Sequence, residues 1–215
     1  MICRMMVALI ESHFLPSLEY ICALLPFDEI IVERWEHFPK QTYRNRCYIN
    51  TAQGVKILTV PLHDRHGKIL MKDIRVQAGK QWRNALWRTI ESAYRKAPYF
   101  DYYFEELKTM LFVEHEYLVD LNNDLLSFCL RNARTQKRIF TSTSYEKQAD
   151  QNKKDLRCVI MDKKPFVLRN FYRPCPYHQV FGNDFAANLS FIDLLFCEGP
   201  GSLAIVKASA GVLNK

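Results

Sequence analysis

The stretch MMVALIESHFLPSLEYICALLPFDEIIVERW, residues 5–35, contains the pattern that decides the fold. It opens with the continuous apolar run 5–10, which is typical of a strand buried on both faces of a sheet. Ser17 can then cap a helix whose apolar positions recur at helical spacing until Pro26 stops it. The β-branched residues that follow predict a second strand over 29–35. Strand, helix and strand in this length form a βαβ unit, whose two strands run parallel.

The remaining sequence predicts what surrounds this unit. Segments 47–49 and 55–60, separated by the turn-like NTAQG, predict a hairpin that extends the sheet. Further along, the predicted elements are helices over 82–97, 99–113 and 118–133, short strands at 159–160 and 166–168, and a helix from Leu189 that stops at Gly199. The fold class is therefore α/β: an N-terminal βαβ unit with a mostly parallel sheet, then a helical region and a small C-terminal α/β portion.

Length and composition restrict the class of protein. A chain of 215 residues with 48% hydrophobic and 25% charged residues is an ordinary globular chain, which excludes a mostly disordered one. We expect one domain over 1–206, with a mobile basic loop at 141–155 and a frayed tail at 207–215. No apolar stretch approaches the length of a membrane span and no secretory signal is evident, so a cytoplasmic location is predicted.

The net charge and the cysteine content limit the kinds of ligand and metal ion that the protein is expected to bind. The net charge of +7 attracts anions of any kind, and eight basic against three acidic residues lie between Arg131 and Arg157. A solvated helix end followed by a loop is the favoured interpretation of that stretch, and a phosphate or nucleic-acid footprint is the other. Seven irregularly spaced cysteines predict reduced thiols. The close pair His63 and His66 lacks evident partner ligands, so no metal site is predicted.

The densest polar cluster is KQTYRNR, residues 40–46. Lys40, Arg44 and Arg46 lie just after the second predicted strand, where ligands of open α/β sheets bind. Arginine offers the fork that phosphate or carboxylate requires, while Tyr43 and Asn45 could contact a hydroxyl or an amide. These five residues are predicted to bind an anionic small molecule. The alternative, a surface strand that pairs with the acidic residues before it, stays open.

The turn after the first predicted strand is the second candidate. Glu11 and His13 would emerge at the same edge of the sheet, and His13 is a candidate general acid. A helix capped by Ser17 can also bind an anion through its free amides. An ordinary capped turn with a partly buried histidine is the alternative. Tyr177 and Gln179 are added to the binding set, although the sequence does not fix their position.

Aromatic and basic side chains alternate between Trp82 and Phe104. Such an arrangement can stack bases or sugar rings. Helical spacing favours a packed helix pair with its arginines in solvent. A non-catalytic binding or assembly protein that docks through these helices is the alternative function, and nucleic-acid binding ranks below it.

A series of motifs carries a family resemblance: FLPSLEY, ERWEHFPKQTYRNRCYI, LTVPL, IESAYRKAPYFDYYFEEL, PYHQVF and NLSFIDLLFCEGP. In this order, over residues 7–205, the chain resembles the WbqC-like protein family in the short form associated with Bacteroidota. The resemblance implies a bacterial cytoplasmic protein. Some members are associated with surface-polysaccharide (O-antigen) gene clusters and have been suggested to be glycine or aminoacyl-type transferases. Leu86 and Glu19 depart from the family pattern, which has a histidine and often a glycine there.

The N-terminal half is also similar to the nucleotide-binding half of pantothenate-synthetase-like adenylate-forming enzymes. That similarity places His13 near a signature histidine and Lys40 near a phosphate contact, whereas Glu19 and Tyr20 replace the expected glycine and histidine. Together the resemblances imply a transferase that binds ATP or a nucleotide-sugar and transfers an aminoacyl-type group, with His13 and Glu11 as the catalytic pair.

Overall fold

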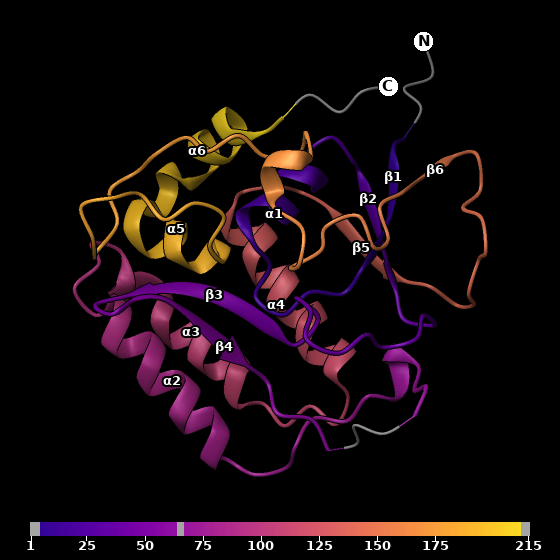
Figure 1. Ribbon diagram of the computed structural model, residues 1–215, viewed down its shortest axis with the longest axis horizontal. Helices are drawn as coiled ribbons and strands as arrows, with labels where there is room; N and C mark the ends of the chain where they lie inside the picture. Colours follow the sequence, from indigo (N-terminus) through magenta and orange to yellow (C-terminus); the bar gives the residue numbers. More distant parts are fainter. Residues whose placement is uncertain (1–4, 64–66, 212–215) are drawn as a thin grey trace.

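The computed structural model describes residues 5–63 and 67–211 and contains a four-stranded parallel sheet, which lies in the right half of Figure 1. The strands are β1 (Val7–Glu11), β2 (Glu29–Glu33), β5 (Arg138–Thr141) and β6 (Lys153–Asp155), in the order β5-β2-β1-β6. Helix α1 (Leu18–Leu24) connects β1 to β2, which pair in parallel from Val7 with Glu29 to Glu11 with Glu33. The predicted βαβ unit and the α/β class are confirmed.

Helix α1 is buried along its whole length because the sheet, helix α6 and the C-terminal segments enclose it. The Ser17 side chain accepts a hydrogen bond from the Tyr20 amide at 3.4 Å, as a capping residue should. At the other end, the Lys137 ammonium donates to the carbonyl oxygens of Leu25 and Phe27. A cation at the C-terminus of a helix also complements the helix dipole.

The strand order places a topological switch point at β1. From β1 the chain adds β2 and then β5 on one side, and later returns to add β6 on the other side of β1. In open α/β sheets, ligands bind beyond the carboxyl ends of the strands at such a reversal. The loops that follow β1 and β6 are therefore the place to look for a site.

The hairpin β3 (Arg46–Thr51) and β4 (Gly54–Thr59) is antiparallel and forms a sheet of its own. The prediction that it extends the main sheet is wrong, because β5 and β6 occupy the two edges of that sheet. The hairpin instead packs against helix α2 (Figure 1). It buries Cys47 and Ile49 of β3 and exposes most of β4.

The predicted helices are present. They are α2 (Gln81–Tyr94), α3 (Phe100–Phe112), α4 (Leu118–Asn132) and α5 (Phe191–Glu198), followed by α6 (Ser202–Ser209). Short 3₁₀ helices lie at η1 (Met71–Asp73), η2 (Phe166–Leu168) and η3 (Gly199–Gly201). Helix α5 ends at Gly199 as predicted, in the left-handed region at φ 48°. An added Cβ there would lie 2.4 Å from the Tyr99 ring, so glycine is required.

The aromatic residues of α2 and α3 lie mostly inside the molecule. Trp87, Tyr94 and Phe100 are buried in the core, whereas Tyr102 is 77% exposed. The buried rings therefore hold the helices together, as the helical spacing favours, while Trp82, Tyr99, Tyr103 and Phe104 are half-buried.

Three expectations for the C-terminal third need correction. Residues 166–168 form η2 and residues around Val159 form a turn, so the two strands predicted there are wrong and this portion is helical. The segment 141–155, expected as a loop, contains strand β6. The tail expected to fray from 207 continues in α6 through Ser209, and 212–215 lie outside the described residues.

Within the part of the chain that the structure describes, no helix has the length and apolar character needed to cross a membrane.

The buried strands of the sheet should dominate stability. Ile10 in β1 is fully buried, whereas Ile57 in β4 is 45% exposed. We expect Ile10→Ala to lower the free energy of unfolding by about 2 to 5 kcal/mol, because it leaves a cavity in the core. The matched change Ile57→Ala should cost less than about 1 kcal/mol. Urea denaturation measures both, and equal losses would contradict the described burial.

Candidate functional site at the switch point

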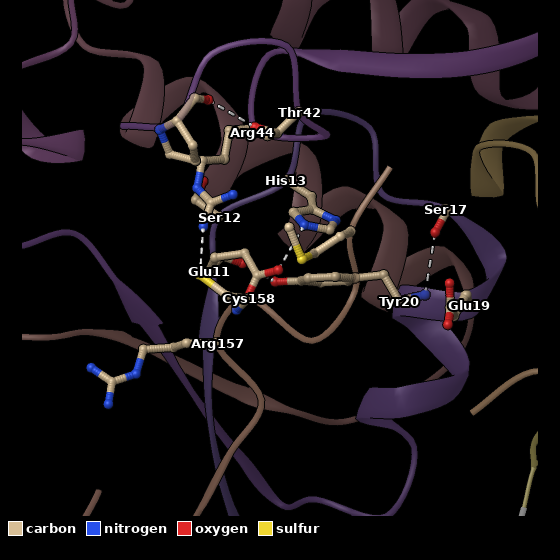
Figure 2. A network of polar contacts seen from close by, with 12 residues as sticks. Glu11, Ser12, His13, Ser17, Glu19, Tyr20, Thr42, Arg44, Arg157 and Cys158 are labelled. Atoms are coloured by element: carbon tan, nitrogen blue, oxygen red, sulfur yellow. Dashed lines mark hydrogen bonds and ion pairs between the residues drawn. The ribbon is translucent and has the colours of Figure 1, made fainter. Parts of the chain in front are cut away.

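The carboxylate of Glu11 joins the two loops at the switch point. Glu11 is the last residue of β1, and His13 lies in the turn after it; both are buried. Glu11 Oε1 lies 3.3 Å from His13 Nε2, and Oε2 accepts the backbone N–H of Cys158, just after β6, at 2.9 Å (Figure 2). The Tyr20 hydroxyl donates to the Glu11 carbonyl at 2.8 Å. The ends of β1 and β6 are thus held together.

The imidazole of His13 lies between two tyrosine rings. Its centroid is 4.4 Å from that of Tyr20 and 5.2 Å from that of Tyr43. Burial lowers the pKa of His13 below its usual value, despite the neighbouring Glu11, so the ring is neutral at pH 7. A neutral ring that donates from Nε2 to Glu11 keeps a lone pair on Nδ1, and Nδ1 is buried with no hydrogen-bond partner among the described residues.

Glu11 is charged in this setting. Burial alone would raise its pKa, but the hydrogen bond with His13 and the nearby Arg44 guanidinium lower it below the usual value. The pair at pH 7 is therefore a carboxylate and an oriented neutral imidazole. This is the arrangement that lets a histidine act as a general base.

The Arg44 guanidinium is committed to a buried ion pair. Its Nε and Nη2 donate to the two Glu36 oxygens at 2.6 Å and 2.7 Å. Burial raises the pKa of Glu36, whereas the paired carboxylate holds the pKa of Arg44 above its usual value against the opposing effect of burial. Arg44 Nη2 also lies 3.8 Å from the Cys158 sulfur. Arg44 thus lies at the switch point beside Glu11, His13 and Cys158, and we call these residues and the side chains bound to them the switch-point cluster. The Nε and Nη2 atoms of Arg44, which could bind an anion as a pair, are already bound to Glu36.

Cys158 is the member of this cluster that faces solvent. Its backbone lies in the left-handed region at φ 57°, which a residue with a side chain adopts at some cost. Burial raises the pKa of its thiol, while the charge of Arg44 acts in the opposite direction. Cys158 is therefore the point at which solvent reaches the switch-point cluster, and Glu11 lies buried behind it.

A second carboxylate ends the neighbouring strand. Glu33, the last residue of β2, accepts from Arg157 Nη1 at 3.0 Å and from the Ser142 hydroxyl at 2.6 Å. Arg157 also donates to both oxygens of Asp155. The loop after β6 is consequently attached to the ends of both β1 and β2.

The other predicted site residues lie in different places. Lys40 is exposed, and the Arg46 Nε is buried and has no hydrogen-bond partner in the part of the chain that the structure describes. Asn45 donates to the Val60 carbonyl at 3.1 Å, at the base of the hairpin. The structure thus brings Glu11, His13, Tyr43 and Arg44 together, with Lys40, Asn45 and Arg46 in the adjoining segment.

Tyr177 and Gln179 belong to a separate network around Asp193 of α5. The Tyr177 hydroxyl and the Gln179 amide donate to Asp193 Oδ2 at 2.6 Å and 3.0 Å, and the Tyr94 hydroxyl donates to Oδ1 at 2.7 Å. Burial raises the pKa of Asp193. The hydrogen bonds of these side chains hold the C-terminal helices to α2.

Sequence reasoning missed three residues at the switch point, which are Glu33, Arg157 and Cys158. The pair of Arg44 with Glu36 corresponds to the alternative left open for the basic segment, although it is buried and not on the surface. Glu11 and Glu33 each end one of two adjacent parallel strands, and such a pattern is a usable signal. Arg157 and Cys158 had no such signal, because their position depends on β6. Within residues 5–63 and 67–211, no group of three or more His, Cys, Asp or Glu side chains is placed to hold a metal ion.

An open parallel α/β domain with a buried charged cluster at its switch point is the class that fold and site define. Within that class, the chain belongs to the WbqC-like protein family, which matches residues 11–164 and so includes the cluster from Glu11 to Cys158. It is 30% identical over 144 residues to the uncharacterised protein Rv1507c of Mycobacterium tuberculosis. That match covers 65% of this chain and 61% of the relative, less than two thirds of its length. No solved structure matches the chain.

The buried ion pair can be tested by removing its acid. Glu36→Ala leaves the Arg44 guanidinium buried without a counter-charge, so we expect the free energy of unfolding to fall by about 3 to 5 kcal/mol. The matched control is Glu91→Ala, which breaks the surface pair with Arg95, 3.7 Å apart, and should cost under about 0.5 kcal/mol. Chemical denaturation at pH 7 measures both. A Glu36 variant as stable as the control would refute the described pair.

The neutral state of His13 predicts a pH dependence. Below pH 6.5 the unfolded chain protonates this histidine while the folded protein does not, so stability falls as the pH drops through this window. The slope for one proton is at most about 1.4 kcal/mol per pH unit. We expect His13→Gln to flatten the denaturation profile between pH 7.5 and 5.5, with the exposed-site variant His178→Gln as the control. A His13→Gln profile parallel to that of the wild type would contradict the lowered pKa of His13 in the folded protein.

Proposed function

We propose that this WbqC-like protein is a transferase that binds a nucleotide or nucleotide-sugar and transfers an aminoacyl-type, glycine-like group in surface-polysaccharide biosynthesis. The observation that carries the proposal is the oriented, neutral His13 beside the Glu11 carboxylate at the switch point of the sheet. The carboxyl edge of an open parallel sheet is where nucleotides bind in many α/β enzymes, and the family resemblance supplies the reaction class.

The chemistry needs a base, which the Glu11–His13 pair can supply. Glu11 fixes the ring by accepting from Nε2, and Nδ1 takes the proton of the attacking amine or hydroxyl. The lone pair of that nucleophile forms a bond to the acyl carbon, and the leaving group departs with the electrons of the broken bond. The Glu11 carboxylate stabilises the imidazolium that forms.

Access to His13 requires Tyr43 to move. Tyr43 is 8% exposed and its ring covers the imidazole, on the segment that also carries the basic residues. A donor that binds this segment would displace Tyr43 and at the same time reach Nδ1. Binding of the donor and exposure of the base are then one event, which keeps water away from the base when no donor is present.

Lys40 and Arg46 are the cations proposed to hold the phosphates. Glu36 neutralises Arg44, whereas neither Lys40 nor Arg46 takes part in an ion pair within the described part of the chain. The charge of Arg46 also reaches Tyr48, whose ring packs edge-on against Tyr43. Arg44 would position the cluster, and Arg46 would contact the ligand.

The binding step is tested by calorimetric titration with ATP and with nucleotide-sugars. Arg46→Ala should weaken binding about 10- to 100-fold, the loss of one charge-assisted hydrogen bond to phosphate. The control is Arg95→Ala, which removes a cation from the exposed end of α2 and should leave affinity unchanged. Failure of every nucleotide to bind, or equal affinities for the two variants, would sink this part of the proposal.

The catalytic step is tested on the same preparations. Wild type is incubated with ATP, a nucleotide-sugar and glycine, and mass spectrometry follows the aminoacylated sugar. His13→Gln should abolish product while nucleotide binding persists, since it removes the base and leaves Lys40 and Arg46 in place. Nucleotide binding without product in the wild type would favour a non-catalytic binding protein.

A further inference from the structure

Arg83 in the first turn of α2 is a buried cation outside the switch-point cluster. It is 3% exposed, and its Nε and Nη1 donate to the carbonyl oxygens of Leu111 at 3.0 Å and Gly79 at 2.7 Å. Its guanidinium also lies 4.6 Å from the centroid of the Trp82 ring. Across the described residues, no carboxylate forms an ion pair with it. Burial accordingly lowers the pKa of Arg83.

This guanidinium lines a cavity of about 380 Å³. The wall includes Arg75, Gly79, Arg83, Glu114, His115 and Glu116. The volume is in the range of small-molecule sites. A buried guanidinium that borders an open cavity, and that forms no ion pair with a carboxylate of the described residues, leaves a place for a counter-ion in that cavity.

Three other charged or titratable side chains of the wall have ion-pair partners. Arg75 Nε lies 3.5 Å from Glu116 Oε1, and His115 Nε2 lies 2.7 Å from Asp124 Oδ2. Glu114 is exposed and forms no ion pair with the described residues. Its carboxylate nevertheless attracts the Arg83 guanidinium electrostatically. Among the described residues of the wall, Arg83 and Glu114 are therefore a cation and a carboxylate that form no ion pair.

We infer that this cavity binds a small zwitterion, an α-amino acid, with the carboxylate on Arg83 and the ammonium on Glu114. A simple anion would meet the repulsion of Glu114, and a simple cation that of Arg83, whereas a zwitterion satisfies both. The lining of this cavity shares no residue with the switch-point cluster, so the inference stands apart from the proposed function. Binding itself needs neither nucleotide nor transfer.

Ligand-observed NMR, with saturation transferred from the folded protein, tests this site in the absence of nucleotide. The probes are glycine and L-alanine, compared with acetate and methylamine, which each carry one of the two charges. The amino acids should compete with each other and bind at least about tenfold more tightly than either single-charge probe. Acetate binding as tightly as glycine, or no saturable binding of any probe, would overturn the inference and leave Arg83 as a cap for the end of α3.

Two variants locate the binding. Glu114→Gln should weaken amino-acid binding about tenfold and leave acetate binding unchanged or stronger, since only the ammonium contact is lost. The matched control Glu105→Gln alters an exposed glutamate of α3 and should change nothing. Glu114 is exposed, so its variant should fold even where an Arg83 variant fails. Equal affinities for the two glutamine variants would overturn the site. Nucleotide binding measured separately shows whether the proposed function fails with it.

Discussion

The geometry of the site depends on one buried carboxylate. Glu11 links segments 147 residues apart in the sequence, because its two oxygens receive hydrogen bonds from different loops. A charged carboxylate in a dry interior must be satisfied on both oxygens, so neither loop can move away without leaving it unpaired. The position of Cys158 relative to His13 follows from this constraint, and the strained backbone at Cys158 is held by the same hydrogen bond.

The charges around Glu11 are balanced in pairs. Glu36 is matched by Arg44, and Glu33 by Arg157, both at the carboxyl edge of the sheet. Buried ion pairs of this kind add little net stability compared with apolar residues of the same size. The apolar core around β1 and α1 can stabilise the fold by itself. The ion pairs are therefore better understood as fixing positions, which is what a site requires and a core does not.

The sequence predicted the parts of this arrangement that depend on local pattern. The βαβ unit followed from the apolar run before Glu11 and the Ser17 cap, and parallel strands necessarily bring their carboxyl ends to one edge. Strand β6 could not be predicted in the same way, because Lys153–Asp155 is a short charged edge strand that pairs through its backbone. The positions of Arg157 and Cys158 depend on β6, so the sequence could not predict them either. Tyr177 was misplaced for a related reason, since its partner Asp193 interrupts an otherwise apolar helix.

The basic stretch between Arg131 and Arg157 shows how a charge excess can have structural causes. Five of its eight cations contact partners within the molecule. Arg131 pairs with Glu106, Lys137 with two carbonyl oxygens, Arg138 with Glu29, Lys153 with Glu146, and Arg157 with Glu33 and Asp155. Two of these contacts, Arg138 with Glu29 and Arg157 with Glu33, attach β5 and the loop after β6 to the central strand β2. Lys40 and Arg46, the cations proposed to hold an anionic ligand, differ from these five in that neither forms an ion pair with a described residue.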